Sequence, residues 1–423
     1  HINAPMPQRA LDASWAYTPE IIEAEALEDL YEYISAYSKT FTDHPLVTEY
    51  CKIWMHASAS SPHALLDILE SRIAYVTTPT ENVPPQISKQ LSVPAAPRFE
   101  TQRVERILEY APLLQDELSR FLEPLLVLVE RWLDKTDQVL SEALQRSRQS
   151  PQPVGHRLVN VLNALHKAMS ANPSTKVIVF SGWLQTLEAL LPHLEHCYGE
   201  NVIAQFTCGL DDEQLQINAD NFQSIPHCRI LLCDELGGEG RNFQIADQII
   251  HIDLPWTPAQ LEQRIGRVDR LGRSGLVRSI IPYAQDWPEE DLFHIWQDAF
   301  QLFTRSMSGM EIVLEGIQEE LLDAIKINPR TGLAQLVEGM VSKAEDLREA
   351  VEEERYFEEA SVNTNLREEF DHISERFQDG KLLRTACLKW ASIVGLSTTY
   401  NQQTDILIFQ PRRFNLASMN KAR

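Results

Sequence analysis

The chain has 423 residues, a hydrophobic fraction of 43% and a formal net charge of −23. At roughly 100–200 residues per domain, this length predicts two to four domains with sizeable cores. The acidity argues against indiscriminate nucleic-acid binding through a generally basic surface, but it leaves room for a local basic track. No run of about 18 apolar residues occurs, so no helix that spans a membrane is expected.

The cysteines predict a reducing environment. Six are scattered along the chain without a Cys-x-x-Cys pair: Cys51, Cys197, Cys208, Cys228, Cys233 and Cys387. This pattern indicates free thiols in a cytoplasmic protein, and the first residues do not have the form of a secretory signal. The spacing of His193, His196 and Cys197 is similar to that of one half of a metal site. No second pair of ligands follows in the sequence, which favours an ordinary helix surface.

The first 150 residues are expected to form a helical domain. Residues 19–76 and 101–148 carry apolar side chains at helical spacing. The segment between them, 77–99, contains five prolines and is predicted to be irregular and exposed. Pro151 and Pro153 then mark a boundary.

Residues 151–285 predict an α/β domain. Short apolar runs rich in β-branched residues indicate buried strands at 176–180, 202–206, 229–233, 248–252 and 277–282. Helical segments at 184–197 and 211–222 and an arginine-rich helix alternate with them. This alternation predicts a parallel sheet covered on both faces, with ligands bound at the carboxyl ends of its strands.

A glycine-rich loop follows the third of these strands. Gly237, Gly238 and Gly240 permit positive φ and the close approach of another backbone. Such a loop can present amide groups to phosphate oxygens, although a turn without any ligand is the commoner meaning of this composition. Its position one strand before the arginine-rich helix strengthens the functional interpretation.

The arginine-rich helix is the most informative stretch. Within residues 263–270, Arg264, Arg267 and Arg270 recur at a spacing of three, which puts them on one side of a helical turn. A guanidinium keeps its charge at working pH and fits phosphate with a rigid fork of donors. The sequence therefore favours a nucleotide-phosphate site, with a solvated basic helix face as the alternative.

The region after residue 285 is expected to be a helical α+β domain over 286–423. Residues 345–377 could form a helical hairpin or short coiled coil, and 404–409 indicates a late strand. The acidic residues between 345 and 359 are typical of a solvated helix face. The alternative is a surface that docks a basic partner or repels misplaced DNA.

Three segments together resemble the second RecA-like lobe of superfamily 2 helicases. KVIVFSG resembles motif IV, LLCDELGGEGRNFQ resembles motif V, and LEQRIGRVDRLGR resembles motif VI. The wording is closest to chromatin-remodeller-type ATPases of the RapA-like, RNA-polymerase-associated family. The resemblance implies an α/β fold with one RecA-like lobe between mainly helical N- and C-terminal domains, the first of which is similar to the connection between two motor lobes. The turn Ser60-Ser-Pro-His-Ala-Leu-Leu is similar to one found in that connection.

The resemblance implies roles for motif VI and motif V residues. Arg267 and Arg270 match the arginines that reach the nucleotide phosphates, and Gln263 matches the glutamine that ties nucleotide state to lobe closure. In motif V, Gly238, Gly240 and Asn242 match a loop between nucleotide and nucleic-acid backbone.

The resemblance also implies a nucleic-acid track. Ser181 and Gly182 fall at the end of motif IV near this track, and Arg264 and Arg273 are extra basic residues that contact nucleic-acid phosphate or form structural ion pairs. The sequence departs from the RapA-type pattern at Gln214, where an arginine is usual, which puts a nucleic-acid contact from that turn in doubt.

The implied function is the C-terminal motor lobe of an ATP-dependent translocase on double-stranded DNA or RNA. The chain has no phosphate loop and no Asp-Glu-x-His segment for Mg²⁺, and Asp234 and Glu235 belong to motif V, for which a metal role is rejected. ATP and Mg²⁺ are thus expected to be bound mainly by a first lobe outside this chain, and the chain alone is expected to be inactive. The alternatives are a non-catalytic docking module in an RNA polymerase or defence complex, and an unwinding helicase.

Overall fold

A computed structural model of the protein describes residues 8–12, 14–78, 90–93, 95–146, 154–238, 242–269, 275–306, 311–346, 349, 381–393, 396–401 and 406–411. The chain divides into two compact units, residues 1–348 and 349–423. The boundaries expected near residues 150 and 285 do not coincide with this division, and they stay predictions from the sequence.

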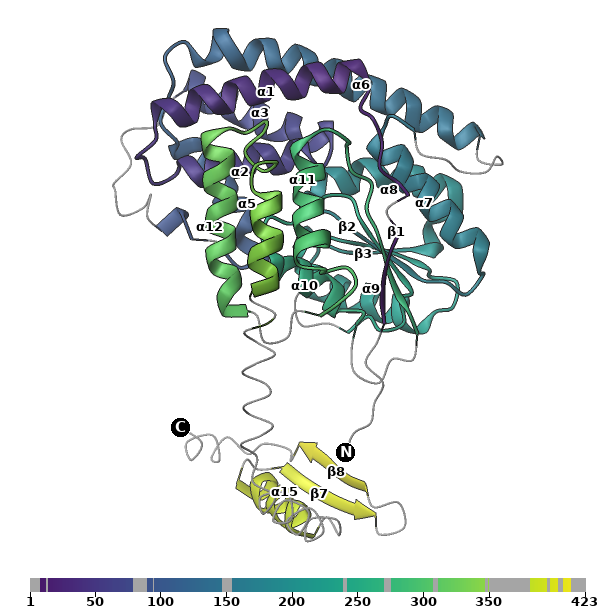
Figure 1. Ribbon diagram of the computed structural model, residues 1–423. Coiled ribbons are helices and arrows are strands. Elements are labelled where there is room, and N and C mark those ends of the chain that lie inside the picture. The colour runs from purple at the N-terminus through teal and green to yellow at the C-terminus, as the bar shows by residue number, and fades with distance from the viewer. Residues whose placement is uncertain are drawn as a thin grey trace. The chain divides into compact units, whose positions relative to one another are not determined.

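A parallel sheet of six strands forms the centre of the first unit, which confirms the expected α/β lobe (Figure 1). The strand order is β1-β6-β5-β2-β4-β3, and every pairing is parallel. The strands are β1 (Arg9–Asp12), β2 (Val177–Phe180), β3 (Ile203–Phe206), β4 (Ile230–Cys233), β5 (Gln248–His251) and β6 (Val277–Ile280). Five of them lie where the apolar runs predict strands. Strand β1 falls in the segment expected to be helical, and it extends the sheet beyond β6.

The strands bury both faces, as the continuous apolar runs predict. In β2, Val177 and Val179 join a core formed with α7 (Arg157–Ala171) and α8 (Leu184–Tyr198). Ile178 and Phe180 alternate with them and join a second core on the opposite face. Helices α9 (Asp212–Ser224) and α10 (Pro258–Gly266) contribute to that second core. The sheet is therefore covered by helices on both sides.

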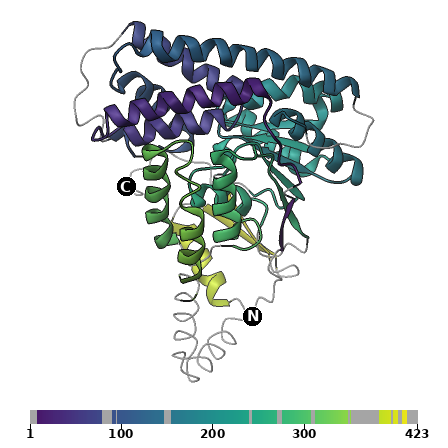
Figure 2. The ribbon, with the colours of Figure 1, turned by 45° about the horizontal axis from the view of Figure 1, so that its top comes forward.

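The N-terminal helices extend the second core, and α1 and α6 run side by side (Figure 2). The elements are α1 (Ile21–Thr40), α2 (Val47–Ser58), α3 (Pro62–Thr77), α5 (Pro97–Tyr110), η1 (Leu118–Leu122) and α6 (Glu123–Arg146). Buried Arg72 of α3 donates hydrogen bonds to Glu117 at 2.8 and 3.0 Å and so fixes α3 against the segment that precedes η1. The helical region and the sheet form one packed body, because one apolar core runs through both.

Three further elements follow the sheet: α11 (Pro288–His294), η4 (Ile295–Ala299) and α12 (Glu311–Ile327). Helix α12 packs against α1, α2 and α10. In the second unit, α15 (Lys381–Ile393) precedes an antiparallel pair, β7 (Leu396–Asn401) and β8 (Ile406–Pro411), so the late strand is confirmed. Most of the expected hairpin at 345–377 lies outside the described residues.

In the part of the chain that the structure describes, no helix combines the length and apolar character needed to cross a bilayer.

Candidate nucleotide and nucleic-acid interface

The carboxyl ends of the central strands bring the motif segments together. Ser181 and Gly182 follow β2, Asp234 and Glu235 follow β4, and Asp253 follows β5. Because parallel strands end at the same edge, these residues converge on a single region, which lies next to the start of α10.

Asp253 is the centre of this region. Its Oδ2 accepts hydrogen bonds from Ser181 Oγ at 2.6 Å and Ser60 Oγ at 2.8 Å. Its Oδ1 lies 2.9 Å from the Gly182 amide nitrogen and 3.3 Å from His56 Nε2. Ser60 and His56 come from the N-terminal helical region, so this carboxylate joins that region to motif IV. We use the name Asp253 network for Asp253 and the residues bonded to it, which are Ser60, His56, Ser181, Gly182 and Arg264.

Arg264 completes the network from motif VI. Its guanidinium lies 3.1 Å from Asp253 Oδ1, 2.8 Å from the Asp253 carbonyl and 2.6 Å from Glu235 Oε1. Arg264 and Asp253 are both 0% exposed. Burial alone would raise the pKa of Asp253, but the His56 hydrogen bond and the charge of Arg264 hold it well below its usual range. Asp253 is thus a carboxylate at any physiological pH.

Of the two roles expected for Arg264, a structural ion pair and a contact with nucleic-acid phosphate, the structure shows the ion pair. The side chain forms an ion pair with two carboxylates inside the protein, and a contact with nucleic-acid phosphate would require this pair to open. The nucleic-acid role therefore stays a prediction, whereas the ion pair is observed. Arg273, for which the same alternatives were open, lies outside the described residues.

Gln263 and Arg267 of the α10 segment are more exposed than Arg264. The helix starts at Thr257, whose hydroxyl accepts a hydrogen bond from the Gln260 amide at 3.1 Å, and Pro258 fits the first turn. Gln263 is exposed and Arg267, the C-cap, is half-buried. They are four residues apart and so lie on one side of the helix. Arg270 lies outside the described residues.

The end of the motif V loop is hydrogen-bonded to motif VI. The amide of Phe243 donates to the carbonyl of Arg267 at 2.9 Å, and the Phe243 ring is buried against Phe206 and Phe222. The neighbouring Asn242 is exposed. Gly238 ends the short helix Glu235–Gly238, and Gly240 lies outside the described residues.

Arg9 of β1 contacts the same helix from the edge of the sheet. Its guanidinium lies 2.7 Å from Glu262 Oε1 and also forms an ion pair with Asp269. The arginine side chain is 4% exposed. Arg9 therefore holds residues 262–269 at both ends, and Arg264 forms its ion pairs from within this segment.

Asp234, for which a metal role was rejected, and Gln214, whose nucleic-acid contact was in doubt, both form hydrogen bonds within the protein. Asp234 accepts hydrogen bonds from the amides of Cys208 at 2.6 Å and Leu236 at 2.9 Å. Gln214 occupies the third position of α9 and exchanges hydrogen bonds with the N-cap Asp211, so the residue that departs from the RapA-type pattern caps a helix. Among the described residues, no three His, Cys, Asp or Glu side chains are placed to hold a metal ion.

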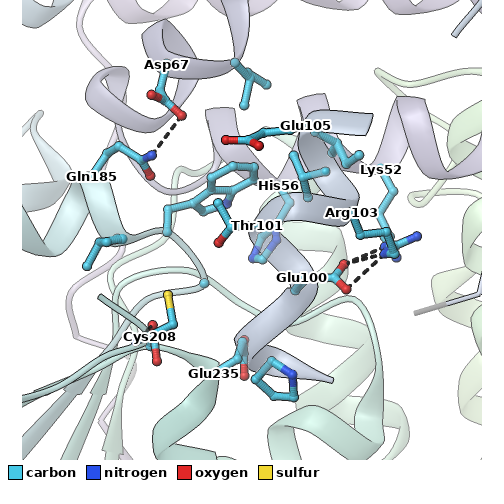
Figure 3. Close-up of a pocket in the computed structure, with 18 of the residues that line it drawn as sticks. Lys52, His56, Asp67, Glu100, Thr101, Arg103, Glu105, Gln185, Cys208 and Glu235 are labelled. Carbon is cyan, nitrogen blue, oxygen red and sulfur yellow. Dashed lines mark hydrogen bonds and ion pairs between the residues drawn. The ribbon is translucent and has the colours of Figure 1, made fainter. Parts of the chain in front are cut away.

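Ser181 and Gly182 are more enclosed than the motif comparison implies. Ser181 is 0% exposed, and a Cβ atom on Gly182 would lie 2.5 Å from Cε1 of His56. Gly182 lines a pocket of about 220 Å³ together with residues of α2, α3 and α5 (Figure 3). The N-terminal helices thus approach the end of motif IV closely.

Sequence reasoning missed Asp253, His56 and Ser60 as members of the site. A signal for Asp253 was present, because an acidic residue directly follows a buried strand in the segment Asp253-Leu-Pro-Trp256. Ser60 belongs to the Ser-Ser-Pro turn, in which Ser61 caps α3. His56 carries no local signal, since its partner is 197 positions away in the chain.

Known proteins share this region. Residues 160–272 match the family model described as the helicase conserved C-terminal domain. Among curated proteins, the chain is similar to the RNA polymerase-associated protein RapA of Pseudomonas putida (strain W619), with 35% identity over 126 residues. The matched segment is 30% of this chain and 13% of that protein. This similarity to RapA agrees with the resemblance that the motifs indicated.

Two solved structures have similar folds. The alignment with the C-terminal part of the Fun30 ATPase domain covers 76% of this chain and 97% of the Fun30 chain, with a TM-score of 0.40 and 14% identity. The alignment with the Sulfolobus solfataricus SWI2/SNF2 ATPase core in complex with dsDNA covers 48% of this chain and 42% of the Sulfolobus chain, with a TM-score of 0.31 and 19% identity. At these scores the two likenesses carry no argument about function.

Proposed function

We propose that this chain supplies the C-terminal motor lobe of an ATP-dependent, RapA-type translocase or remodeller of double-stranded nucleic acid. The observation that carries this proposal is the geometry of α10. Arg9 forms ion pairs with Glu262 and Asp269, and Arg264 forms ion pairs from a position between them. Gln263 and Arg267 are more exposed than Arg264. A fixed helix that offers a guanidinium and an amide suits the phosphates of a nucleotide.

Arg267 and Arg270 act as the arginine fingers in this proposal, with Gln263, Gly238 and Gly240 beside the nucleotide. ATP and Mg²⁺, bound mainly by the first RecA-like lobe of the same protein, supply the phosphoryl group and the charge that its transfer requires. Guanidinium groups alone provide neither a phosphate cradle nor a positioned water. The isolated chain is therefore proposed to be inactive.

Nucleic-acid contact is proposed for motifs IV and V. Asn242 is exposed and contacts the nucleic-acid backbone directly, and Arg264 and Arg273 are the basic residues proposed to add phosphate contacts. Ser181 and Gly182 contribute by fixing the loop after β2, because their hydroxyl and amide groups are hydrogen-bonded to Asp253. The hydrogen bond between Phe243 and Arg267 supports direct transmission between the nucleic-acid and nucleotide sides.

The similar RapA protein is named as RNA polymerase-associated, which supports RNA polymerase as a proposed partner in the cytoplasm. A second candidate function is a docking module for a polymerase or a defence complex. The acidic pocket beside motif IV favours this second candidate.

The test is ATP hydrolysis by the chain joined to a first RecA-like lobe of RapA type. We expect turnover stimulated by double-stranded DNA or RNA, and Arg267→Ala should lower kcat by about 10³-fold or more. Arg131→Ala is the matched control, because Arg131 is an exposed arginine on α6. Unchanged turnover in Arg267→Ala, with folding intact by circular dichroism, would remove the arginine assignment. Turnover that neither nucleic acid stimulates would remove the translocase and leave the docking module.

A further inference from the structure

The pocket beside motif IV has a composition that the motor function does not use. It lies between helices α2, α3 and α5 and the segments that follow β2, β3 and β4. In Figure 3, Asp67 and Glu105 lie above the opening and Cys208 and Glu235 lie below it. All of these residues belong to the first compact unit.

The pocket has an excess of negative charge. Its lining includes the carboxylates Asp67, Glu100, Glu105, Asp234 and Glu235, and the cations Lys52 and Arg103. Five carboxylates against two cations give a formal charge of −3. Asp67 and Glu105 are exposed at this pocket, and the excess of negative charge favours a cation over a phosphate.

Asp67 and Glu105 carry most of the negative charge that no ion pair compensates. Glu100 forms an ion pair with Arg103 at 2.5 Å and Glu235 forms one with Arg264 at 2.6 Å. Asp67 accepts a hydrogen bond from the neutral side-chain amide of Gln185 at 2.8 Å. Burial raises the pKa of Asp67, and the charges of Glu105 and of two further glutamates raise it too. A cation placed between Asp67 and Glu105 would relieve this repulsion.

The rest of the lining is apolar and aromatic. Trp183, Leu184, Leu236 and Trp256 line the pocket, and an aromatic ring face attracts an organic cation. Trp183 is 9% exposed and Trp256 is 5% exposed. In the described part of the chain, neither indole N–H has a hydrogen-bond acceptor. Both nitrogens are shielded from solvent, so the ring carbons are what the two tryptophans offer to the pocket.

These features together define the ligand. The volume of about 220 Å³ is smaller than the roughly 300–1,000 Å³ of sites for drug-sized ligands, and it suits a single extended side chain. A metal ion does not fit, because no three donor side chains of the described residues are placed to hold one. An ammonium or guanidinium on an apolar stem satisfies the carboxylates and the rings.

We propose that this pocket binds an arginine or lysine side chain presented by a partner polypeptide. Gln260 of α10 lines the pocket, but Gln263 and Arg267 do not, so binding there is expected to need no nucleotide. Since Gly182, Asp234 and Leu236 line the pocket, the partner would sit directly against motifs IV and V. The proposal does not depend on the proposed ATPase.

The test is calorimetric titration of the full chain with a blocked tetrapeptide that contains one arginine, in the absence of ATP and nucleic acid. The matched ligand carries citrulline, which keeps the shape of arginine but lacks its charge. We expect the arginine peptide to bind at least tenfold more tightly than the citrulline peptide. Equal binding of the two peptides would overturn the proposal.

Variants locate the binding site. Glu105→Gln and Asp67→Asn should each weaken the arginine peptide about tenfold, while Glu130→Gln, an exposed glutamate on α6 outside the pocket, should leave it unchanged. Circular dichroism checks that each variant is folded. Binding unaffected by both pocket variants would overturn the site. Spermidine is the third ligand: tighter binding than the peptide would overturn a polypeptide as the source of the cation.

Discussion

Replacement of Arg264 tests whether the Asp253 network is structural. The change is Arg264→Met, which keeps much of the apolar stem and removes the charge. Asp253 would then be a fully buried carboxylate without its cationic partner, and Glu235 would lose its ion pair. Removing one member of a buried ion pair costs about 3–5 kcal/mol, because the remaining charge is neither solvated nor neutralised.

The assay is urea denaturation near pH 7, followed by circular dichroism. We expect Arg264→Met to lower the free energy of unfolding by about 3–5 kcal/mol, whereas Arg131→Met at an exposed position should change it by no more than about 0.5 kcal/mol. The double variant Arg264→Met/Asp253→Asn should recover part of the loss, since it no longer buries an unpaired carboxylate.

A specific result would refute this reasoning. If Arg264→Met were as stable as Arg131→Met but bound nucleic acid more weakly, Arg264 would be a phosphate contact and the ion pair would contribute little. The wild-type protein gives a second check. Because the pKa of Asp253 in the folded protein is well below its usual value, the stability that this group contributes is present above the unfolded pKa. It is lost only when the pH falls through the folded pKa, so Asp253 should add no pH dependence near neutrality.

Two further predictions concern the contacts between the helical region and the sheet. Gly182→Ala should destabilise the protein, because the new Cβ would displace His56 from Asp253; adding His56→Ala should relieve the clash, and a clash-free Gly182→Ala would show that His56 moves without cost. Burial raises the pKa of Glu23 from 4.5 to about 7, opposed by the charge of Arg157. The folded state therefore binds this proton more tightly, and the free energy of unfolding should fall by about 3 kcal/mol as the pH rises from about 4.5 to 7. Urea titrations at about pH 5 and pH 8 should show that the free energy of unfolding changes less with pH in Glu23→Gln than in the wild-type protein. An equal change in the two proteins would contradict the raised pKa of Glu23.

The sheet was largely predictable from sequence because its strands are apolar runs buried on both faces. The runs at 177–180 and 230–233 need no tertiary information to be identified as strands. Strand β1 was not predictable in this way. Its sequence, Arg-Ala-Leu-Asp, has no apolar run, and it is a strand because β6 offers a free edge.

The candidate site was predictable only in part. Motif VI indicated the arginines, but their spacing of three does not determine which of them is buried. Three residues on an α-helix turn through about 300°, so neighbours in this series differ by about 60° in direction. The edge of the buried face falls between Arg264 and Arg267. The Asp253 network joins residues up to 197 positions apart, and no local pattern encodes such contacts.

The position of β1 has a mechanical consequence. Its first residue, Arg9, forms ion pairs with Glu262 and Asp269, which flank Arg267 in the sequence. Tension applied to the polypeptide ahead of Arg9 would reach these carboxylates before it deformed any helix of the N-terminal region. A pull from that direction would thus act directly on the segment that carries Arg267.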